Sequence, residues 1–378
     1  AQIVAFPELC LTGYIIGDLW EVDTLVRDFA SYSEDVREMS GGMTVIFGNV
    51  AVDEGLIAED GRLRKYNAVF VCADGRFVKR SGLPLQLPSG IHVKTLHPNY
   101  RFFDDDRHFY SARKLADSTG NSLYDWCVPY EVDFGGRMFR FGVQLCEDMW
   151  CADYIYRSEI ADTLKRYHER GAEVVFNLSS SPWTWQKNDK RNRVVADILE
   201  RSPLPFVYVN HVGSQNNGKN IITFDGDSAI YDAAGQLAKR APPWRELLML
   251  SSCENEFCAP QTEIEAIFDA VITGLRHMDY VRGDECRYVV GTSGGIDSSV
   301  VTCLLTQAFG KERVFAVNMP TRFNAAVTQD NARDMCRALD VDYISCPIEE
   351  LYQAVASLVQ GAEFCTGPGE YTRLVDEN

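Results

Sequence analysis

The sequence predicts an α/β protein of two domains, the first with mixed sheets covered by helices and the second with a doubly wound parallel sheet. The 378 residues fit two domains at roughly 100–200 residues each. Residues 1–240 mix strand-like runs, helical stretches and hairpins, whereas residues 262–378 alternate regularly between strand and helix. Residues 241–261 carry Pro242, Pro243 and Pro260 without clear periodicity, which indicates a linker.

Composition excludes several classes of protein. Apolar residues make up 46% and charged residues 24%, so the chain is not expected to be disordered or of low complexity. A net charge of −17 argues against nucleic-acid or anionic-membrane partners, which require a positive surface. No apolar run approaches the ~18 residues of a membrane span. Twelve cysteines without a Cys-x-x-Cys pair or a secretion signal indicate reduced thiols and a cytoplasmic location.

In the first region, apolar runs and turn residues place the elements in order. Short buried runs predict strands, and a run that ends at Gly171 predicts a helix, since glycine is favoured just beyond a helix C-terminus. The expected strands are 4–6, 43–52, 67–72, 75–79, 130–134, 138–145, 173–178, 206–210 and 228–231, and the expected helices are 25–39, 158–170 and 190–201.

The second region has a simpler pattern, in which strand and helix follow one another as in a parallel sheet. The expected helices are 262–282, 298–309, 328–339 and 348–359, and the expected strands are 287–290, 314–318 and 342–346. Between the first of these strands and its helix lies the Gly-rich stretch 291–299, Gly-Thr-Ser-Gly-Gly-Ile-Asp-Ser-Ser.

This Gly-rich stretch has the composition of an anion site. Glycines let backbone N–H groups approach a phosphate, and the helix that follows points its positive end at the same place. Ser293 and Ser298 add hydroxyl donors, and Asp297 could hold a divalent cation. The spacing is neither that of a Walker A loop nor that of a dinucleotide fingerprint. Two adjacent glycines alone would equally fit a turn without a ligand.

The sequence of residues 293–298, Ser-Gly-Gly-Ile-Asp-Ser, resembles the pyrophosphate-binding loop of the ATP pyrophosphatases. These enzymes bind ATP with Mg²⁺, adenylate a substrate and release pyrophosphate. Residues 318–321, Asn-Met-Pro-Thr, resemble a second family segment near the ATP. The resemblance implies an adenine-nucleotide, Rossmann-like sheet, a metal ligand in Asp297, and ATP contacts from Gly291, Ser293, Gly294, Gly295, Asp297, Ser298 and Met319.

One cysteine stands apart from the others. Cys146 follows the strand 138–145 and precedes Glu147 and Asp148, whose charges would raise the pKa of a thiol. From position alone, a structural cysteine is the simpler interpretation. A nucleophile here would need a base and a cation from elsewhere in the chain.

Three segments in order resemble the nitrilase superfamily, whose fold is an α-β-β-α sandwich. Residues 6–8, Phe-Pro-Glu, match its base segment, residues 94–100 its lysine segment, and residues 145–150, Leu-Cys-Glu-Asp-Met-Trp, its nucleophile segment. The resemblance implies a catalytic base in Glu8, an oxyanion-stabilising Lys94 and a nucleophile in Cys146. Residues 177–183 resemble the strand end that lines the family's pocket. The implied glutamine contacts are Tyr14, Tyr100, Asp105, Glu147, Ser179 and Ser181.

Three details leave alternatives open. Asp105 stands where the family has a second, longer Glu, so its reach to Lys94 is one methylene shorter. Lys79 is a rival for the catalytic lysine, because residues 81–90 form a longer segment than the family pattern. The stretch 183–187, Trp-Thr-Trp-Gln-Lys, is interpreted as pocket wall or subunit contact, and five histidines, His211 among them, as surface or core residues.

An amidase of this type followed by such a nucleotide loop is similar to the family of glutamine-dependent NAD synthetases. The resemblance implies hydrolysis of glutamine to ammonia, ATP-dependent amidation of deamido-NAD, release of AMP and pyrophosphate, no prosthetic group, and a homo-oligomer. The alternatives are a stand-alone glutamine or ω-amide hydrolase whose second domain is inactive, and one whose second domain senses a nucleotide. Ala1 lies at the start of an apolar run, and residues 376–378 resemble the start of a further family segment. We therefore expect that residues are missing at both ends and that the synthetase domain is cut at its C-terminal side.

Overall fold

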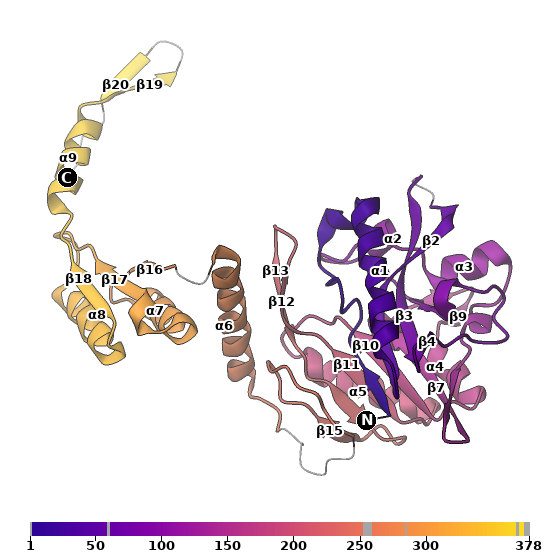
Figure 1. Cartoon of the computed structure of the whole chain (residues 1–378). Coiled ribbons are helices and arrows are strands. Elements are labelled where there is room, and N and C mark those ends of the chain that lie inside the picture. Colours follow the sequence, from indigo (N-terminus) through magenta and orange to yellow (C-terminus); the bar gives the residue numbers. More distant parts are fainter. Residues whose placement is uncertain (1, 59–60, 252–258, 284–285, 368–369, 374–378) are drawn as a thin grey trace. The chain divides into compact units, whose positions relative to one another are not determined.

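The computed structural model describes residues 2–58, 61–251, 259–283, 286–367 and 370–373 (Figure 1). The chain divides into two compact units, Ala1–Ala270 and Val271–Asn378. The sequence-based limits 1–240, 241–261 and 262–378 stay predictions, and part of the predicted linker, 252–258, lies outside the described residues, as do 376–378. Within the described residues, no helix combines the length and the apolarity that crossing a bilayer would require.

The first unit is built on two sheets. One has the order β1-β2-β3-β4, with β5 paired to β3, and the other has the order β15-β14-β11-β10-β7-β6. The strands of the first sheet are β1 (Ile3–Ala5), β2 (Thr44–Ile57), β3 (Leu63–Ala73), β4 (Arg76–Phe77) and β5 (His92–Val93). Those of the second are β6 (Tyr130–Phe134), β7 (Arg137–Leu145), β10 (Val174–Ser179), β11 (Phe206–Asn210), β14 (Ala229–Tyr231) and β15 (Leu237–Arg240).

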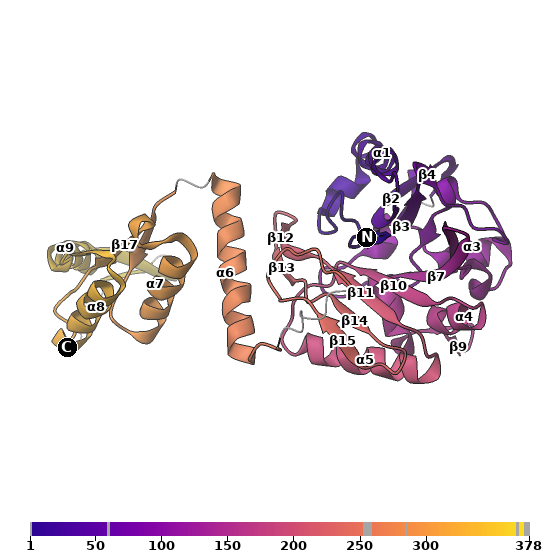
Figure 2. The ribbon, with the colours of Figure 1, turned by 60° about the horizontal axis from the view of Figure 1, so that its bottom comes forward.

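The two sheets pack face to face, with helices on their outer sides. Because strand side chains alternate, Ile46 of β2 faces Val143 and Phe176 of the other sheet, while Val45 and Phe47 face outward to the helices. Figure 2 shows α5 lying along the second sheet and α1 beside the first. The helices are α1 (Asp23–Met39), α2 (Asp105–His108), α3 (Ala112–Thr119), α4 (Thr163–Glu169) and α5 (Lys187–Arg201). This is the α-β-β-α sandwich that the resemblance to the nitrilase superfamily implied, with the mixed sheets and covering helices that the residue pattern predicted.

Two short hairpins complete the unit, and one of them replaces the start of a predicted helix. Strands β12 (Val212–Asn216) and β13 (Ile221–Asp225) pair antiparallel, as do β8 (Ile155–Tyr156) and β9 (Glu159–Ile160). The predicted helix 158–170 is therefore wrong at its start, since α4 begins at Thr163. The left-handed backbone of Ser158 turns the β8–β9 hairpin, and the Asp162 side chain accepts a bond from Lys165 N and caps the helix.

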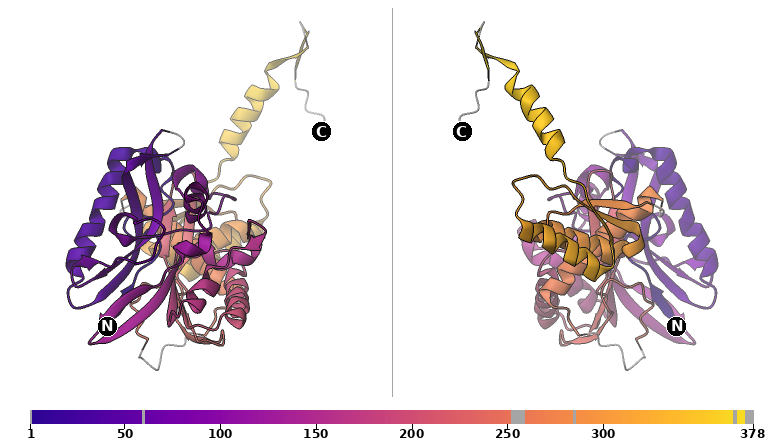
Figure 3. Two further views of the ribbon diagram at one scale, coloured as in Figure 1. Left: turned by 90° about the vertical axis from the view of Figure 1, so that its right-hand side faces the viewer. Right: turned by 90° about the vertical axis from the view of Figure 1, so that its left-hand side faces the viewer.

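The second unit contains a parallel sheet of the order β16-β17-β18, as predicted. Its strands are β16 (Tyr288–Gly291), β17 (Val314–Asn318) and β18 (Asp342–Ser345), and its helices are α7 (Ile296–Phe309), α8 (Ala326–Leu339) and α9 (Glu349–Gln360). Helix α6 (Glu263–Arg282) crosses the border between the units. Figure 3 shows α9 leading away from the sheet to a hairpin of β19 (Glu363–Gly367) and β20 (Glu370–Arg373).

Candidate active site

Close backbone packing positions Glu8 directly after β1. Gly48 N donates to Pro7 O at 3.1 Å, and Cys10 N donates to Gly48 O at 3.0 Å. A Cβ on Gly48 would lie 2.6 Å from the Cα of Glu8, so only glycine lets β2 approach this segment. The side chain of Glu8 is fully buried between the sheets.

Both carboxylate oxygens of Glu8 are held by donors. Oε1 accepts from Asn67 Nδ2 at 2.7 Å and from Lys94 Nζ at 2.8 Å, and Oε2 accepts from Ser180 N at 2.9 Å. Its backbone carbonyl accepts from Ser180 Oγ and His211 Nε2, each at 2.8 Å. Three segments of the chain therefore fix the carboxylate and a fourth, with His211, fixes the backbone of the same residue, which is the arrangement expected of a positioned base.

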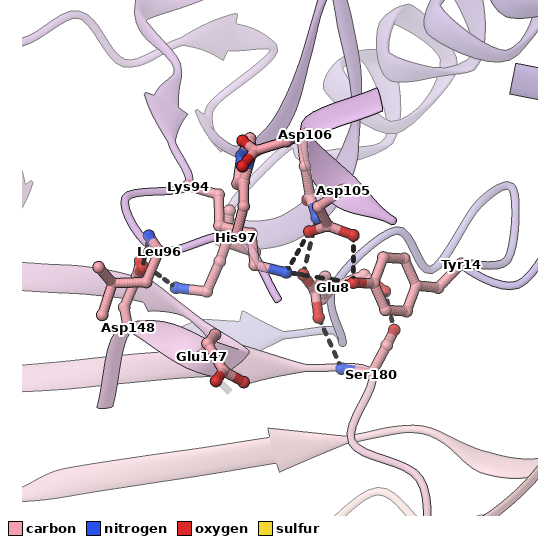
Figure 4. A network of polar contacts seen from close by, with 12 residues as sticks. Glu8, Tyr14, Lys94, Leu96, His97, Asp105, Asp106, Glu147, Asp148 and Ser180 are labelled. Carbon is pink, nitrogen blue, oxygen red and sulfur yellow. Dashed lines mark hydrogen bonds and ion pairs between the residues drawn. The ribbon is translucent and has the colours of Figure 1, made fainter. Parts of the chain in front are cut away.

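Lys94 lies between two carboxylates, as Figure 4 shows. Its Nζ is 2.8 Å from Glu8 Oε1 and 2.9 Å from Asp105 Oδ2, and its side chain has no exposed surface. The shorter side chain of Asp105 thus reaches the lysine. Tyr14 donates its hydroxyl to Asp105 Oδ1 at 2.5 Å. Lys79, the rival lysine, is exposed, so the geometry favours Lys94.

Cys146 begins the 3₁₀ segment Cys146–Asp153 directly after β7. Its φ of 38° lies in the left-handed region, a strained conformation for a residue with a side chain. Asp148 fixes this turn against the lysine segment, because its Oδ1 accepts from Thr95 N and Leu96 N while its Oδ2 accepts from Leu145 N. Asp148 therefore fixes the position of the Cys146 turn relative to the segment that carries Lys94.

The electrostatics define a neutral thiol beside a charged lysine. Burial raises the pKa of Cys146 from 9.0 to about 12, the carboxylate of Glu8 adds to this rise, and the ammonium of Lys94 opposes it. Burial alone lowers the pKa of Lys94, but Asp105 and Glu8 outweigh it and hold that pKa well above its ordinary value. At neutral pH the cysteine therefore needs a base to remove its proton, and Glu8 is available for that role.

A cavity of about 730 Å³ opens onto Cys146. Tyr14, Tyr100, Glu147 and Ser181 of the predicted binding set line it. Ser179, in contrast, is fully buried, and its hydroxyl donates to Asn177 Oδ1 at 2.7 Å. Of the aromatic stretch 183–187, Trp185 and Lys187 line the cavity, which fits its interpretation as pocket wall.

Side chains of opposite charge line this cavity. Glu147 accepts hydroxyl bonds from Tyr154 at 2.7 Å and from Tyr100 at 3.1 Å. Lys187, at the start of α5, donates to Pro182 O at 3.0 Å, and burial lowers its pKa. A ligand with one cationic and one anionic end would find a partner for each end.

Sequence reasoning missed five residues of this site: Asn67, Tyr154, Ser180, Lys187 and His211. Asn67, Tyr154 and His211 come from segments whose sequence carries no recognisable chemistry, whereas Ser180 and Lys187 lie in the stretches 177–183 and 183–187 that were interpreted as pocket lining without these two residues being singled out. Each of the five joins the site only when segments far apart in the chain come together. For Ser180, the position just after strand β10 was a usable signal, because strand ends on one edge of a sheet gather at its site. His211, set aside as a surface or core residue, donates to the carbonyl of Glu8.

In the second unit, the Gly-rich loop joins β16 to α7 at the carboxyl edge of the sheet. Ser298 Oγ accepts from Ser293 N at 3.2 Å, and Gly295 N donates to Ser293 Oγ at 3.3 Å, so the loop is folded on itself. Gly294 has a φ of 83°, and a Cβ there would lie 1.8 Å from Thr328 O, which explains the glycine. Met319 lies against Gly291, since a Cβ on the glycine would be 3.7 Å from its Cε.

This loop has the features of a phosphate site. Gly295 caps α7, a helix of 14 residues, so the free N–H groups of its first turn meet the loop. Asp297 lies exposed in that first turn and offers hard oxygen donors. One carboxylate together with a substrate's phosphates is the donor set that Mg²⁺ commonly uses, so the residues fit that ion.

Comparison with known proteins agrees with the fold. A carbon-nitrogen hydrolase family model matches residues 1–258, and an NAD synthase model matches residues 273–378. The glutamine-dependent NAD(+) synthetases of Synechocystis sp. and Acinetobacter baylyi are each 27% identical, over 96% and 95% of this chain and 62% and 58% of their own. The chain therefore spans about three fifths of these relatives.

Solved structures show the same relationship. The glutamine-dependent NAD+ synthetase of Acinetobacter baumannii, in complex with ADP, superposes with a TM-score of 0.75 at 25% identity, covering 95% of this chain and 60% of its own. The fold and the two matches define a carbon-nitrogen hydrolase unit followed by an NAD synthase unit. The chain belongs to the carbon-nitrogen hydrolase family and shares the domain order of glutamine-dependent NAD synthetases.

Proposed function

We propose that the first unit hydrolyses the side-chain amide of glutamine and releases ammonia. The observation that carries this proposal is the buried set of Glu8, Lys94 and Asp105 beside Cys146 at the end of a cavity. A thiol, a carboxylate that can accept its proton and a fixed cation are what amide hydrolysis through a thioester requires. Release of ammonia from glutamine by the chain, dependent on Cys146, is the experiment that tests it.

In the proposed reaction, Glu8 removes the thiol proton as the sulfur of Cys146 attacks the amide carbonyl carbon. Lys94 stabilises the oxyanion of the tetrahedral intermediate. Glu8 then returns the proton to the leaving nitrogen, the C–N bond breaks, and ammonia departs from a γ-glutamyl thioester. Water, deprotonated by Glu8, attacks the thioester, and the C–S bond breaks to give glutamate and the free thiol.

For substrate recognition, we propose that Glu147 binds the α-ammonium of glutamine and Lys187 its α-carboxylate. Glu147 is already oriented by the Tyr100 and Tyr154 hydroxyls, and Lys187 is a half-buried cation that lines the same cavity. Tyr14, Asp105 and Ser181 complete the proposed set around the amide end. Ser179 acts, in this proposal, by holding Asn177 rather than through its hydroxyl in the cavity.

Replacing Lys187 by methionine is expected to raise the KM for glutamine by roughly 10- to 100-fold, the loss of one charge-assisted bond. The kcat should change far less, because Lys94 still supplies the cation at the reacting carbonyl. Steady-state ammonia release measures both constants. Lys219→Met, on an exposed turn of the same unit, is the matched control. An unchanged KM in Lys187→Met would rule out this residue as the carboxylate ligand.

For the second unit, we propose that the loop 293–298 binds the pyrophosphate of ATP and Asp297 a Mg²⁺ ion. ATP would adenylate the carboxylate of deamido-NAD, and ammonia from the first unit would displace AMP to give NAD. Gly291, Gly294 and Gly295 supply close backbone approach, Ser293 and Ser298 hydroxyl donors, and Met319 lies beside the loop. We propose a cytoplasmic location for this reaction, because the described cysteines are free thiols and thiols stay reduced in that compartment. We also expect a homo-oligomer.

A longer form of the chain, of the length of its relatives, tests the coupled reaction. Given glutamine labelled with ¹⁵N in its amide, ATP, Mg²⁺ and deamido-NAD, it is expected to form NAD that carries the label in its carboxamide, as mass spectrometry would show. Cys146→Ala should still make NAD from free ammonia. Glutamine hydrolysis without labelled NAD would favour the alternative, an amide hydrolase whose second unit is inactive or senses a nucleotide.

A further inference from the structure

The backbone around Tyr14 is held by a side chain from a distant part of the first unit. Gln215, in strand β12, accepts two hydrogen bonds on its side-chain oxygen, from Tyr14 N and Ile15 N, each at 2.8 Å. Tyr14 and Ile15 are both buried, at 5% and 6% exposure, so water cannot replace these bonds freely. One amide oxygen therefore fixes two consecutive peptide units that belong to no strand.

This contact leads directly to the reacting groups. With its carbonyl bound to Trp20 Nε1 and its N–H bound to Gln215, Tyr14 is anchored on both sides. Its hydroxyl then reaches Asp105 Oδ1 at 2.5 Å and lies 3.4 Å from Lys94 Nζ. A shift of the Tyr14 backbone would remove a donor from Asp105, which is one of the two carboxylates that hold Lys94.

The same hairpin also supports the opposite wall of the cavity. Gln215 pairs with Ile222 across the hairpin, and the neighbouring Thr223 O accepts from Trp183 N at 2.8 Å. Asp225, at the end of β13, accepts from Asn188 in the first turn of α5 at 2.7 Å. Strand β12 thus holds the Tyr14 side and β13 the α5 side, so the hairpin sets the spacing between the two walls.

We propose that Gln215 is a positioning residue for amide hydrolysis, acting through the hydroxyl of Tyr14 on Asp105 and Lys94. The inference rests on the proposed glutamine hydrolysis and names a residue that neither contacts substrate nor lies in the motifs of the sequence. Its side-chain oxygen is the group that matters. A residue of similar size without an acceptor should misplace Tyr14, and one with an acceptor should hold it.

A pair of substitutions separates the effect of the hydrogen-bond acceptor from the effect of the size of the side chain. Gln215→Met is expected to lower the kcat for glutamine hydrolysis about 10-fold or more, since small displacements of positioned groups have effects of this size. Gln215→Glu keeps an acceptor for both N–H groups and should recover most of the rate. Gln236→Met, at an exposed site of the same unit, serves as the control. Equal loss in Gln215→Met and Gln215→Glu would overturn the proposed role of the oxygen.

A double-mutant cycle with Tyr14→Phe tests the route of the effect. If Gln215 acts through the Tyr14 hydroxyl, adding Gln215→Met to Tyr14→Phe should lower kcat by less than about 3-fold further. If the two substitutions each lowered kcat by an independent factor, so that the double variant showed their product, the proposal would be overturned. The rate at which a haloacetamide alkylates Cys146, at a temperature below the melting temperature and measured by mass spectrometry, should be lower in Gln215→Met. That readout does not need glutamine turnover, so it distinguishes a wrong role for Gln215 from a wrong substrate.

Discussion

Replacing Cys146 by alanine is expected to lower glutamine hydrolysis by roughly 10⁴-fold or more, to the background of an ammonia assay. Without the sulfur no thioester can form, and water would have to attack an unactivated amide directly. Alanine fits the site, because it removes one atom from a residue whose surroundings are otherwise fixed by Asp148. Ammonia release at saturating glutamine is the measurement.

A second buried cysteine supplies the control. Cys72 lies in strand β3 and is fully buried, whereas Cys146 is 8% exposed, and Cys72 packs in the hydrophobic core away from the cavity. Cys72→Ala should lose some stability and keep its kcat at a temperature where it is folded. Normal hydrolysis in Cys146→Ala would show that another group attacks the amide.

Replacing Lys94 by methionine is expected to lower both activity and stability. Hydrolysis should fall by about 10³-fold or more, since the oxyanion loses its cation in a water-free site. Two carboxylates 2.8 and 2.9 Å from the missing Nζ would remain buried without it, and breaking such a pair costs about 3–5 kcal/mol of unfolding free energy. Ammonia release and denaturant unfolding measure the two effects.

The pH dependence of this variant follows from the same contacts. In the wild type, the raised pKa of Lys94 keeps its stabilising charge throughout the neutral range, and that contribution is lost only as the pH rises through this raised value. In Lys94→Met this charge is absent, so the loss of stability that the wild type shows at high pH should be absent as well. Lys79→Met, the exposed rival, should leave activity and stability nearly unchanged; a loss of hydrolysis there would reverse the assignment.

The architecture was largely predictable because strong local patterns carry it. The parallel strands of the second unit and strands such as β6, β7 and β11 are apolar runs bounded by turn residues. The β8–β9 and β12–β13 hairpins were not predicted, since their strands are short and mixed in polarity. In residues 158–162, the pattern suggested a helix, but the left-handed turn at Ser158 and the cap at Asp162 decided the local structure.

For the site, motifs located the groups that would do chemistry and not the groups that position them. Glu8, Lys94 and Cys146 stand in recognisable segments, and the structure brings Glu8 and Lys94 into contact. Asn67 makes one hydrogen bond and Gln215 makes two, each to a segment far apart in the chain, and the local sequence has no signal for such contacts. The reach of Asp105 to Lys94 likewise depended on the backbone positions of both residues.

The central claim is that Cys146 attacks the side-chain amide of glutamine in the first unit. The most direct test treats the chain with a glutamine analogue whose amide is replaced by a chloromethyl ketone, followed by peptide mapping. One label is expected, on Cys146, with hydrolysis lost in proportion to labelling and glutamine protecting against both. Full labelling of Cys146 with undiminished ammonia release, or loss of activity with Cys146 unlabelled, would contradict it.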